Sequence, residues 1–290
     1  AAFQKLALPS QRVVTYSIDF DNFLDHGEYT PIEPAPDTVA IQPYTSGSTG
    51  KPKGVLLSHL GQNWSRLILC HTRGTTERDV ILVAAPLYHK NALNALKQGL
   101  TAGAKLILMP QFNIERYIEA IGRYRCTVIS GVPTMTSMVL AQKELLAKTD
   151  VTSVRTVMMG SAPASRQIFD ELNRYFPNAE ALVVYGVTEG GPVPLGPHPQ
   201  GKPRPPGSIG FPYSGTYAKL LKSDGTEGGE GELVLKNPGV LLGYHNLPTE
   251  TAKRVRDGWY YTGDICRRDA EGWYYFVGRT DDMFVCGGEN

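Results

Sequence analysis

The chain has 290 residues, 41% of them hydrophobic, which is enough for one large domain or two smaller ones around a substantial core. Its 29 basic and 28 acidic residues leave a formal net charge of +1, so no global field recruits nucleic acid or an anionic membrane surface. The absence of a ~18-residue apolar run, of a secretory signal and of CxxC pairs among four cysteines favours a cytoplasmic protein with no membrane span.

Short β-branched runs alternate with amphipathic segments over residues 38–190, a pattern typical of βα units around a mostly parallel sheet. Helices are expected behind Ser58 and Asn113, which are suitable N-caps, and over the apolar residues of the segment 168–176. The expected strands are Val80–Ala84, Lys105–Leu108, Thr127–Ser130, Val154–Met159 and Ala181–Val184.

Glycine and proline become frequent beyond Pro192, and the apolar runs become short, which predicts a small antiparallel β subdomain. Its expected strands are Thr216–Leu221, Glu232–Leu235, Trp259–Thr262 and Trp273–Val277. A further strand is possible at Arg12–Ser17. The predicted fold class is α/β, a mostly parallel sheet with flanking helices followed by this antiparallel subdomain.

The segment Thr45–Gly54 combines glycines with hydroxyl and lysine side chains. Small residues let the backbone fold tightly and turn N–H groups inward, while Lys51 and Lys53 add positive charge, so the composition favours a polyphosphate-binding loop. A Walker A loop is not indicated, because that pattern places four residues before its Gly-Lys pair and only two separate Gly47 from Gly50. A flexible linker is the alternative, but it would not need the lysines or the strand-like run that follows.

Four motifs, in order, resemble the signatures of the adenylate-forming, or AMP-binding, superfamily of acyl-CoA synthetases, peptide-synthetase adenylation domains and luciferases. They are YTSGSTGKPKG at 44–54, YGVTE at 185–189, GWYYTGD at 258–264 and GRTDD at 278–282. The match runs from about Asp37 to Asn290. The chain thus looks like an N-terminal core fragment from the acyl-CoA synthetase branch.

The resemblance implies ATP, Mg²⁺ and CoA as cofactors and assigns residues to them. Those expected to bind the nucleotide are Thr45, Ser46, Gly47, Ser48, Thr49, Gly50, Lys53, Gly160, Ser161, Ala162, Pro163, Tyr185, Gly186, Asp264 and Arg279. Glu189 would be the metal ligand and Thr188 a phosphate contact, and both are expected to be catalytic. A carboxylate suits this role because Mg²⁺ prefers hard oxygen ligands, although a Thr-Glu pair taken alone is more often a surface cap.

The adenosine contacts also have simpler alternatives. Tyr185 offers a flat face for the adenine, but taken alone it would be a core residue. Asp264, in a Thr-Gly-Asp turn, would meet the ribose 2′ and 3′ hydroxyls with Arg279 nearby, although an aspartate in a turn is usually turn chemistry.

The acid is expected to bind near Pro86–His89, which resembles the start of the family's acyl pocket. His89 would flank the substrate carboxylate and is expected to be catalytic, although a lone histidine is more often a core residue. Amino-acid-activating domains carry an aspartate in this region, and residues 88–99 contain none, so an acid without an α-amine is favoured. Lys90 and Asn91 indicate a polar substrate or face solvent.

The expected reaction has two steps. The acid attacks ATP to give an acyl-adenylate and pyrophosphate, and CoA then displaces AMP to form the thioester. The alternatives are an enzyme that loads a carrier protein and an inactive ATP-binding module. The expected partners are a small-molecule carboxylic acid and CoA, without nucleic acid, and a homo-oligomer is possible.

The resemblance also implies a domain organisation. Residues 1–195 would form part of an α/β ATP- and acyl-binding subdomain, 196–278 a β-barrel-like subdomain, and 279–290 the hinge and the start of a C-terminal domain. Asp281 matches the hinge about which that domain rotates. The family's catalytic lysine lies in that domain and is not present here, so we expect a truncated chain with weak or no adenylation by itself.

Overall fold

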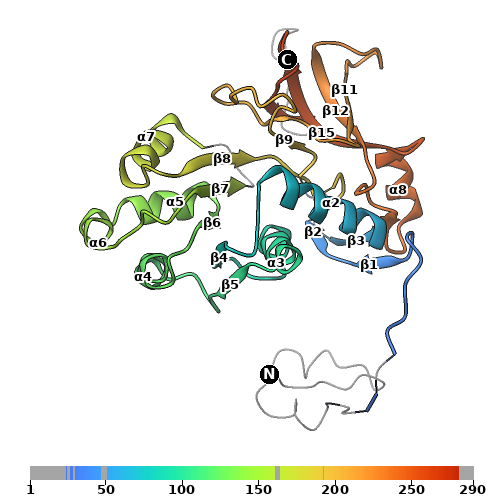
Figure 1. The fold of residues 1–290 in the computed structure, drawn as a ribbon. Helices are drawn as coiled ribbons and strands as arrows, with labels where there is room; N and C mark the ends of the chain where they lie inside the picture. Colours follow the sequence, from blue (N-terminus) through green and yellow to red (C-terminus); the bar gives the residue numbers. More distant parts are fainter. Residues whose placement is uncertain are drawn as a thin grey trace. The chain divides into compact units, whose positions relative to one another are not determined.

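The computed structural model describes residues 24, 27, 28, 30–46, 51–160, 164–191 and 193–280 (Figure 1), with the side chain at position 46 excepted. The chain divides into two units, residues 1–34 and 35–290. All the helices and strands considered below belong to the second unit. The strand expected at Arg12–Ser17 lies outside the described residues.

A five-stranded parallel sheet forms the first half of the second unit, in the order β5-β4-β6-β7-β8. Its strands are β4 (Val80–Val83), β5 (Lys105–Leu108), β6 (Val128–Gly131), β7 (Thr156–Gly160) and β8 (Glu180–Val184). Every pairing in this sheet is parallel, which confirms the predicted βα pattern. β7 begins later than expected because Val154 is still in a turn, with its N–H bonded to the carbonyl of Val151.

Six helices accompany the sheet, and the two predicted N-caps are confirmed. They are α2 (His59–Thr72), α3 (Lys90–Ala102), α4 (Ile114–Tyr124), α5 (Pro133–Leu140), α6 (Lys143–Lys148) and α7 (Arg166–Tyr175). The Ser58 hydroxyl accepts the Gly61 N–H at the start of α2, and Asn113 accepts the Arg116 N–H at the start of α4. Phe176 was expected inside this helix, but it is the C-cap that follows α7.

Helices cover both faces of the parallel sheet (Figure 1). Because successive side chains of a strand point to opposite faces, neighbouring residues enter different cores. Leu82, Ile129 and Val157 pack against helices α4 to α7. Ile81 and Val128 pack instead with alanines of α3. Burial on both faces explains why these strands are continuous apolar runs.

An antiparallel sheet follows, in the order β11-β12-β15-β14 with β16 also paired to β15. Its strands are β11 (Tyr217–Leu221), β12 (Glu230–Lys236), β14 (Val255–Arg256), β15 (Trp259–Arg268) and β16 (Tyr274–Arg279). A two-stranded pair of β9 (Leu195–Gly196) and β10 (Phe211–Pro212) precedes it. The predicted α/β class with an antiparallel second part is confirmed.

A third sheet joins segments that are distant in sequence. It contains β1 (Val39–Ile41), β3 (Pro52–Ser58) and β13 (Gly243–Tyr244), and β2 (Tyr44–Ser46) also pairs with β3. β13 therefore crosses the boundary expected at residues 195 and 196, and that division stays a prediction. Helix α8 (Pro248–Arg254) follows β13. Among the described residues, no helix is long and apolar enough to cross a membrane.

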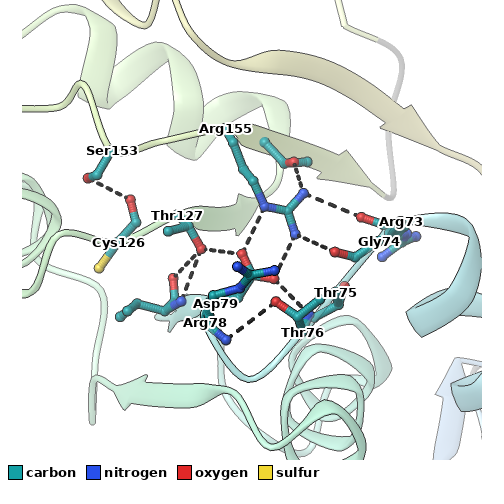
Figure 2. A network of polar contacts seen from close by, with 12 residues as sticks. Arg73, Gly74, Thr75, Thr76, Arg78, Asp79, Cys126, Thr127, Ser153 and Arg155 are labelled. Atoms are coloured by element: carbon teal, nitrogen blue, oxygen red, sulfur yellow. Dashed lines mark hydrogen bonds and ion pairs between the residues drawn. The ribbon is translucent and has the colours of Figure 1, made fainter.

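A polar clamp closes the amino-terminal edge of the parallel sheet (Figure 2). Asp79, Thr127 and Arg155 directly precede β4, β6 and β7. Arg155 donates Nε and Nη2 to the two oxygens of Asp79, both at 2.8 Å, and Thr127 donates its hydroxyl at 2.7 Å. Burial raises the pKa of Asp79, but the hydrogen bonds outweigh burial and hold that pKa at about 2.

Candidate active site

Three segments converge on Glu189, which follows strand β8. Thr45 of β2 donates its hydroxyl to Glu189 Oε1 at 2.9 Å, and Tyr244 of β13 donates to the same oxygen at 3.3 Å. The third sheet makes this possible, because β2 and β13 both pair with β3. Glu189 therefore lies near the carboxyl-terminal edge of the parallel sheet, where open α/β sheets bind their ligands.

The carboxylate of Glu189 fits a divalent cation held together with phosphates. Within the described part of the chain, its hydrogen bonds both end on Oε1, which leaves Oε2 for a ligand. The described residues contain no group of three or more His, Cys, Asp or Glu side chains that could hold a metal ion. Mg²⁺ often takes only one or two protein carboxylates and completes its coordination with substrate phosphates and water.

Lys90, in the first turn of α3, extends to the residue that precedes Glu189. Its ammonium donates to the backbone carbonyl of Thr188 at 2.6 Å. The pKa of Lys90 is lowered to about 7, mainly by burial and also by the nearby charge of Lys97, while the charge of Glu189 opposes both effects. The alternative that Lys90 simply faces solvent is wrong. One sequence signal was available, since a lysine in the first turn opposes the helix dipole.

Tyr185, Asp264 and Arg279 form a second cluster. The hydroxyl of Tyr185 donates to Asp264 Oδ2 at 2.6 Å, and Arg279 Nη1 donates to Oδ1 at 3.0 Å. Asp264 and Arg279 are opposite each other in the pairing of β15 with β16. Burial raises the pKa of Asp264, while Tyr185 and Arg279 lower it. The sequence motifs at 185, 264 and 279 are thus brought together.

The expected turn at Thr262–Asp264 is wrong, because these residues lie inside strand β15. Gly263 has φ +75°, a left-handed conformation that favours glycine, and its N–H bonds to Glu232 of the neighbouring strand β12 at 2.9 Å. The pairing of β12 with β15 shifts register nearby, as at a β-bulge. This irregularity lies beside the Asp264 carboxylate in the strand.

His89 is the N-cap of α3, and its side chain makes no capping hydrogen bond. It is exposed, and its ring lies 4.6 Å from that of Tyr88, so the alternative of a core histidine is wrong. Its role toward the acid stays a prediction. Gly160 ends β7 beside α3: a Cβ there would lie 3.6 Å from Asn91 Nδ2. Gly186 follows Tyr185 and is exposed.

Lys53, an expected nucleotide contact, is bound to a carboxylate. Its ammonium lies 2.6 Å from Glu250 Oε2 on α8 and 5.3 Å from the ring centroid of Tyr244. Hydrogen bonds from Lys253 and Lys53 lower the pKa of Glu250 to about 2. A nucleotide phosphate would compete with Glu250 for this ammonium.

Several expected site residues cannot be placed. The side chain of Ser46 and residues Gly47, Ser48, Thr49, Gly50, Ser161, Ala162, Pro163 and Asp281 lie outside the described residues. Their roles in binding or as a hinge stay predictions. Two residues that the sequence did not single out, Tyr244 and Glu250, contact expected site residues.

The chain resembles known proteins over most of its length. The family model described as AMP-binding enzyme matches residues 3–245. The chain is 35% identical over 259 residues to a feruloyl-CoA synthase from an Amycolatopsis species, with 88% of this chain and 52% of that protein covered. It is 34% identical over 267 residues to 4-coumarate–CoA ligase 1 of Arabidopsis thaliana, with 87% and 47% covered.

A solved structure gives the same picture. The O-succinylbenzoate coenzyme A synthetase of Bacillus subtilis, in complex with ATP and magnesium ion, superposes with a TM-score of 0.81 at 29% identity. The alignment covers 93% of this chain and 57% of that one. The chain spans about half the length of the curated relatives it matches.

Proposed function

Because the chain belongs to the AMP-binding enzyme family, we propose that the protein containing it activates a carboxylic acid with ATP and transfers the acyl group to CoA. The acid's carboxylate attacks the α-phosphorus of ATP, which gives an acyl-adenylate and pyrophosphate, and the thiol of CoA then displaces AMP. The observation that carries this proposal is the meeting of Thr45, Tyr244 and Glu189 at the carboxyl-terminal edge of the sheet.

Each cluster has a part in this reaction. Glu189 would hold Mg²⁺, which offsets the charge of the departing pyrophosphate, and Thr188 would contact a phosphate. Asp264, held by Tyr185 and Arg279, would accept hydrogen bonds from the ribose hydroxyls. No protein nucleophile is needed, because the reaction depends on positioning and on charge neutralisation.

The acid is proposed to lack an α-amine and to bind near His89. The segment 88–99 contains no aspartate for an ammonium group. Two relatives are named for ferulate and 4-coumarate, which are aromatic acids without an α-amine. Aromatic acids therefore come first among the candidates.

The test is acid-dependent exchange between ATP and labelled pyrophosphate, followed by detection of acyl-CoA, with the full-length protein. The panel contains ferulate, 4-coumarate, O-succinylbenzoate, palmitate and phenylalanine. We expect exchange and thioester formation with at least one of the first four acids and none with phenylalanine. Exchange with no panel acid would contradict the proposal. Acyl transfer to a carrier protein but not to CoA would favour the carrier-loading alternative.

A further inference from the structure

The first turn of α3 gathers positive charge at one point. The first N–H groups of a helix have no intrahelical acceptor and form the positive end of its dipole. His89, the N-cap, contributes no side-chain hydrogen bond there. Lys90 then places its amino group in the same turn, half-buried, where a helix favours acidic residues. An anion at this point would balance all three features.

The partners of Lys90 within the protein are incomplete. A lysine ammonium has three N–H donors. Among the described residues, its one hydrogen bond goes to the neutral carbonyl of Thr188. The nearby carboxylate of Glu189 accepts instead from Thr45 and Tyr244. Donors of Lys90 therefore remain available beside Thr188 and Glu189.

The other internal lysine of the same helix provides a comparison. Lys97 lies two turns further along α3, and its ammonium hydrogen bonds to the side-chain oxygen of Gln62 on α2. That contact ties two helices together and needs no ligand. Lys90 has no side-chain acceptor of this kind in the described part of the chain.

We propose that Lys90 and the first turn of α3 form an oxyanion-binding site beside Thr188. This inference rests on the proposed function, in which two oxyanions must meet near Glu189. The oxyanion is either the carboxylate of the acid or a phosphate of ATP. In both cases the ammonium keeps its bond to Thr188 and directs its remaining N–H groups to the ligand. These bonds orient the acid or the ATP for the attack of the carboxylate on the α-phosphorus.

The experiment compares Lys90→Met, Lys90→Arg and the control Lys97→Met in the full-length protein. KM values for ATP and for the acid are measured by pyrophosphate exchange, using the panel acid with the highest rate. Loss of a hydrogen bond to a charged group predicts that Lys90→Met raises one KM by about tenfold or more. A rise for the acid identifies the carboxylate, and a rise for ATP identifies the phosphate. Lys90→Arg, which keeps the charge, should recover most of the loss.

Melting temperatures show whether a variant loses activity only because it is less stable. Binding titrations test the oxyanion site even if the proposed enzymatic activity is absent. If Lys90→Met does not fold, Lys90→Gln takes its place. If the wild type shows no exchange, the proposed function fails, and calorimetric titration of MgATP and of each panel acid still compares the wild type with the variant. The site is overturned if neither ligand binds more weakly to the variant. It is also overturned if Lys90→Met and Lys97→Met lose activity only in step with stability.

Discussion

The charged side chains at the two edges of the parallel sheet have different kinds of partner. At the amino-terminal edge, Asp79 and Arg155 form a two-pronged ion pair, supported by Thr127 (Figure 2). At the carboxyl-terminal edge, Lys90 is bound to a backbone carbonyl and Glu189 to two hydroxyls, so both charges have neutral partners.

This difference distinguishes a structural role of the amino-terminal edge from the proposed ligand-binding role of the carboxyl-terminal edge. A charge withdrawn from water is costly unless an opposite charge and hydrogen bonds compensate it. The clamp supplies that compensation within the protein and fixes the starts of three neighbouring strands. At the opposite edge, the proposed ligand would supply part of this compensation, as is typical of functional sites. The predictions below test this division.

The largest effect is expected at the carboxyl-terminal edge. Glu189→Gln removes the proposed metal ligand and should lower the rate of pyrophosphate exchange by roughly 10²–10³-fold, by analogy with other losses of transition-state charge stabilisation. The matched control is Glu180→Gln, at the exposed amino-terminal end of β8. Equal losses in both variants would show that the two edges do not differ as proposed.

Asp264→Asn should have the next largest effect. The substitution keeps the side-chain size but removes the charge that Arg279 pairs with and that the ribose is proposed to contact. We expect ATP affinity, measured by titration calorimetry, to fall about tenfold or more. Tyr185→Phe removes one hydrogen bond to the same carboxylate and should lower the ATP affinity less. Unchanged ATP affinity in Asp264→Asn would contradict the ribose assignment.

At the amino-terminal edge the expected effect is on stability. Asp79→Asn breaks the buried end of the clamp and should lower the free energy of unfolding by about 3 kcal/mol, measured with urea, while the KM for ATP stays unchanged. The control Asp150→Asn disrupts an exposed pair with Arg125 and should change the free energy of unfolding far less, because water screens exposed ion pairs. A changed KM for ATP with an unchanged free energy of unfolding would show that Asp79 supports ligand binding and not stability.

Much of this architecture was predictable, because local patterns carry it. The apolar runs identified the parallel strands, and Ser58 identified a helix start through its own hydroxyl. The four motifs, which follow one another in the family's order, indicated that residues far apart in the sequence belong to one site. The Asp264 turn was wrong because a Thr-Gly-Asp sequence fits a bulged strand as well as a turn, and only pairing with β12 and β16 decides between them.

The contacts of Tyr244 and Lys90 with distant segments were not predictable. Tyr244 lies in a two-residue strand, which is too short to show a period, and reaches Glu189 only because β13 pairs with β3. Lys90 was noticed, but its direction depends on where α3 crosses the segment after β8. Tertiary packing decides which partners such residues reach, and the local sequence does not name those partners.

The smallest expected effect is the acid response of the clamp. The pKa of Asp79 is lowered to about 2 in the folded protein, from the ordinary value of 3.8 for an aspartate. A carboxyl group with a lowered folded-state pKa stabilises the fold fully above its unfolded pKa, and this contribution is lost as the pH falls toward the folded value.

The wild type should therefore lose the Asp79 contribution between about pH 4 and pH 2, as both states become protonated. Asp79→Asn, which has no carboxyl group to protonate, should show a smaller fall in its urea midpoint over the same interval. Parallel curves for the wild type and Asp79→Asn would mean that the clamp does not hold the carboxylate in its charged form, and the contrast between the two edges would then rest on the ligand-binding side alone.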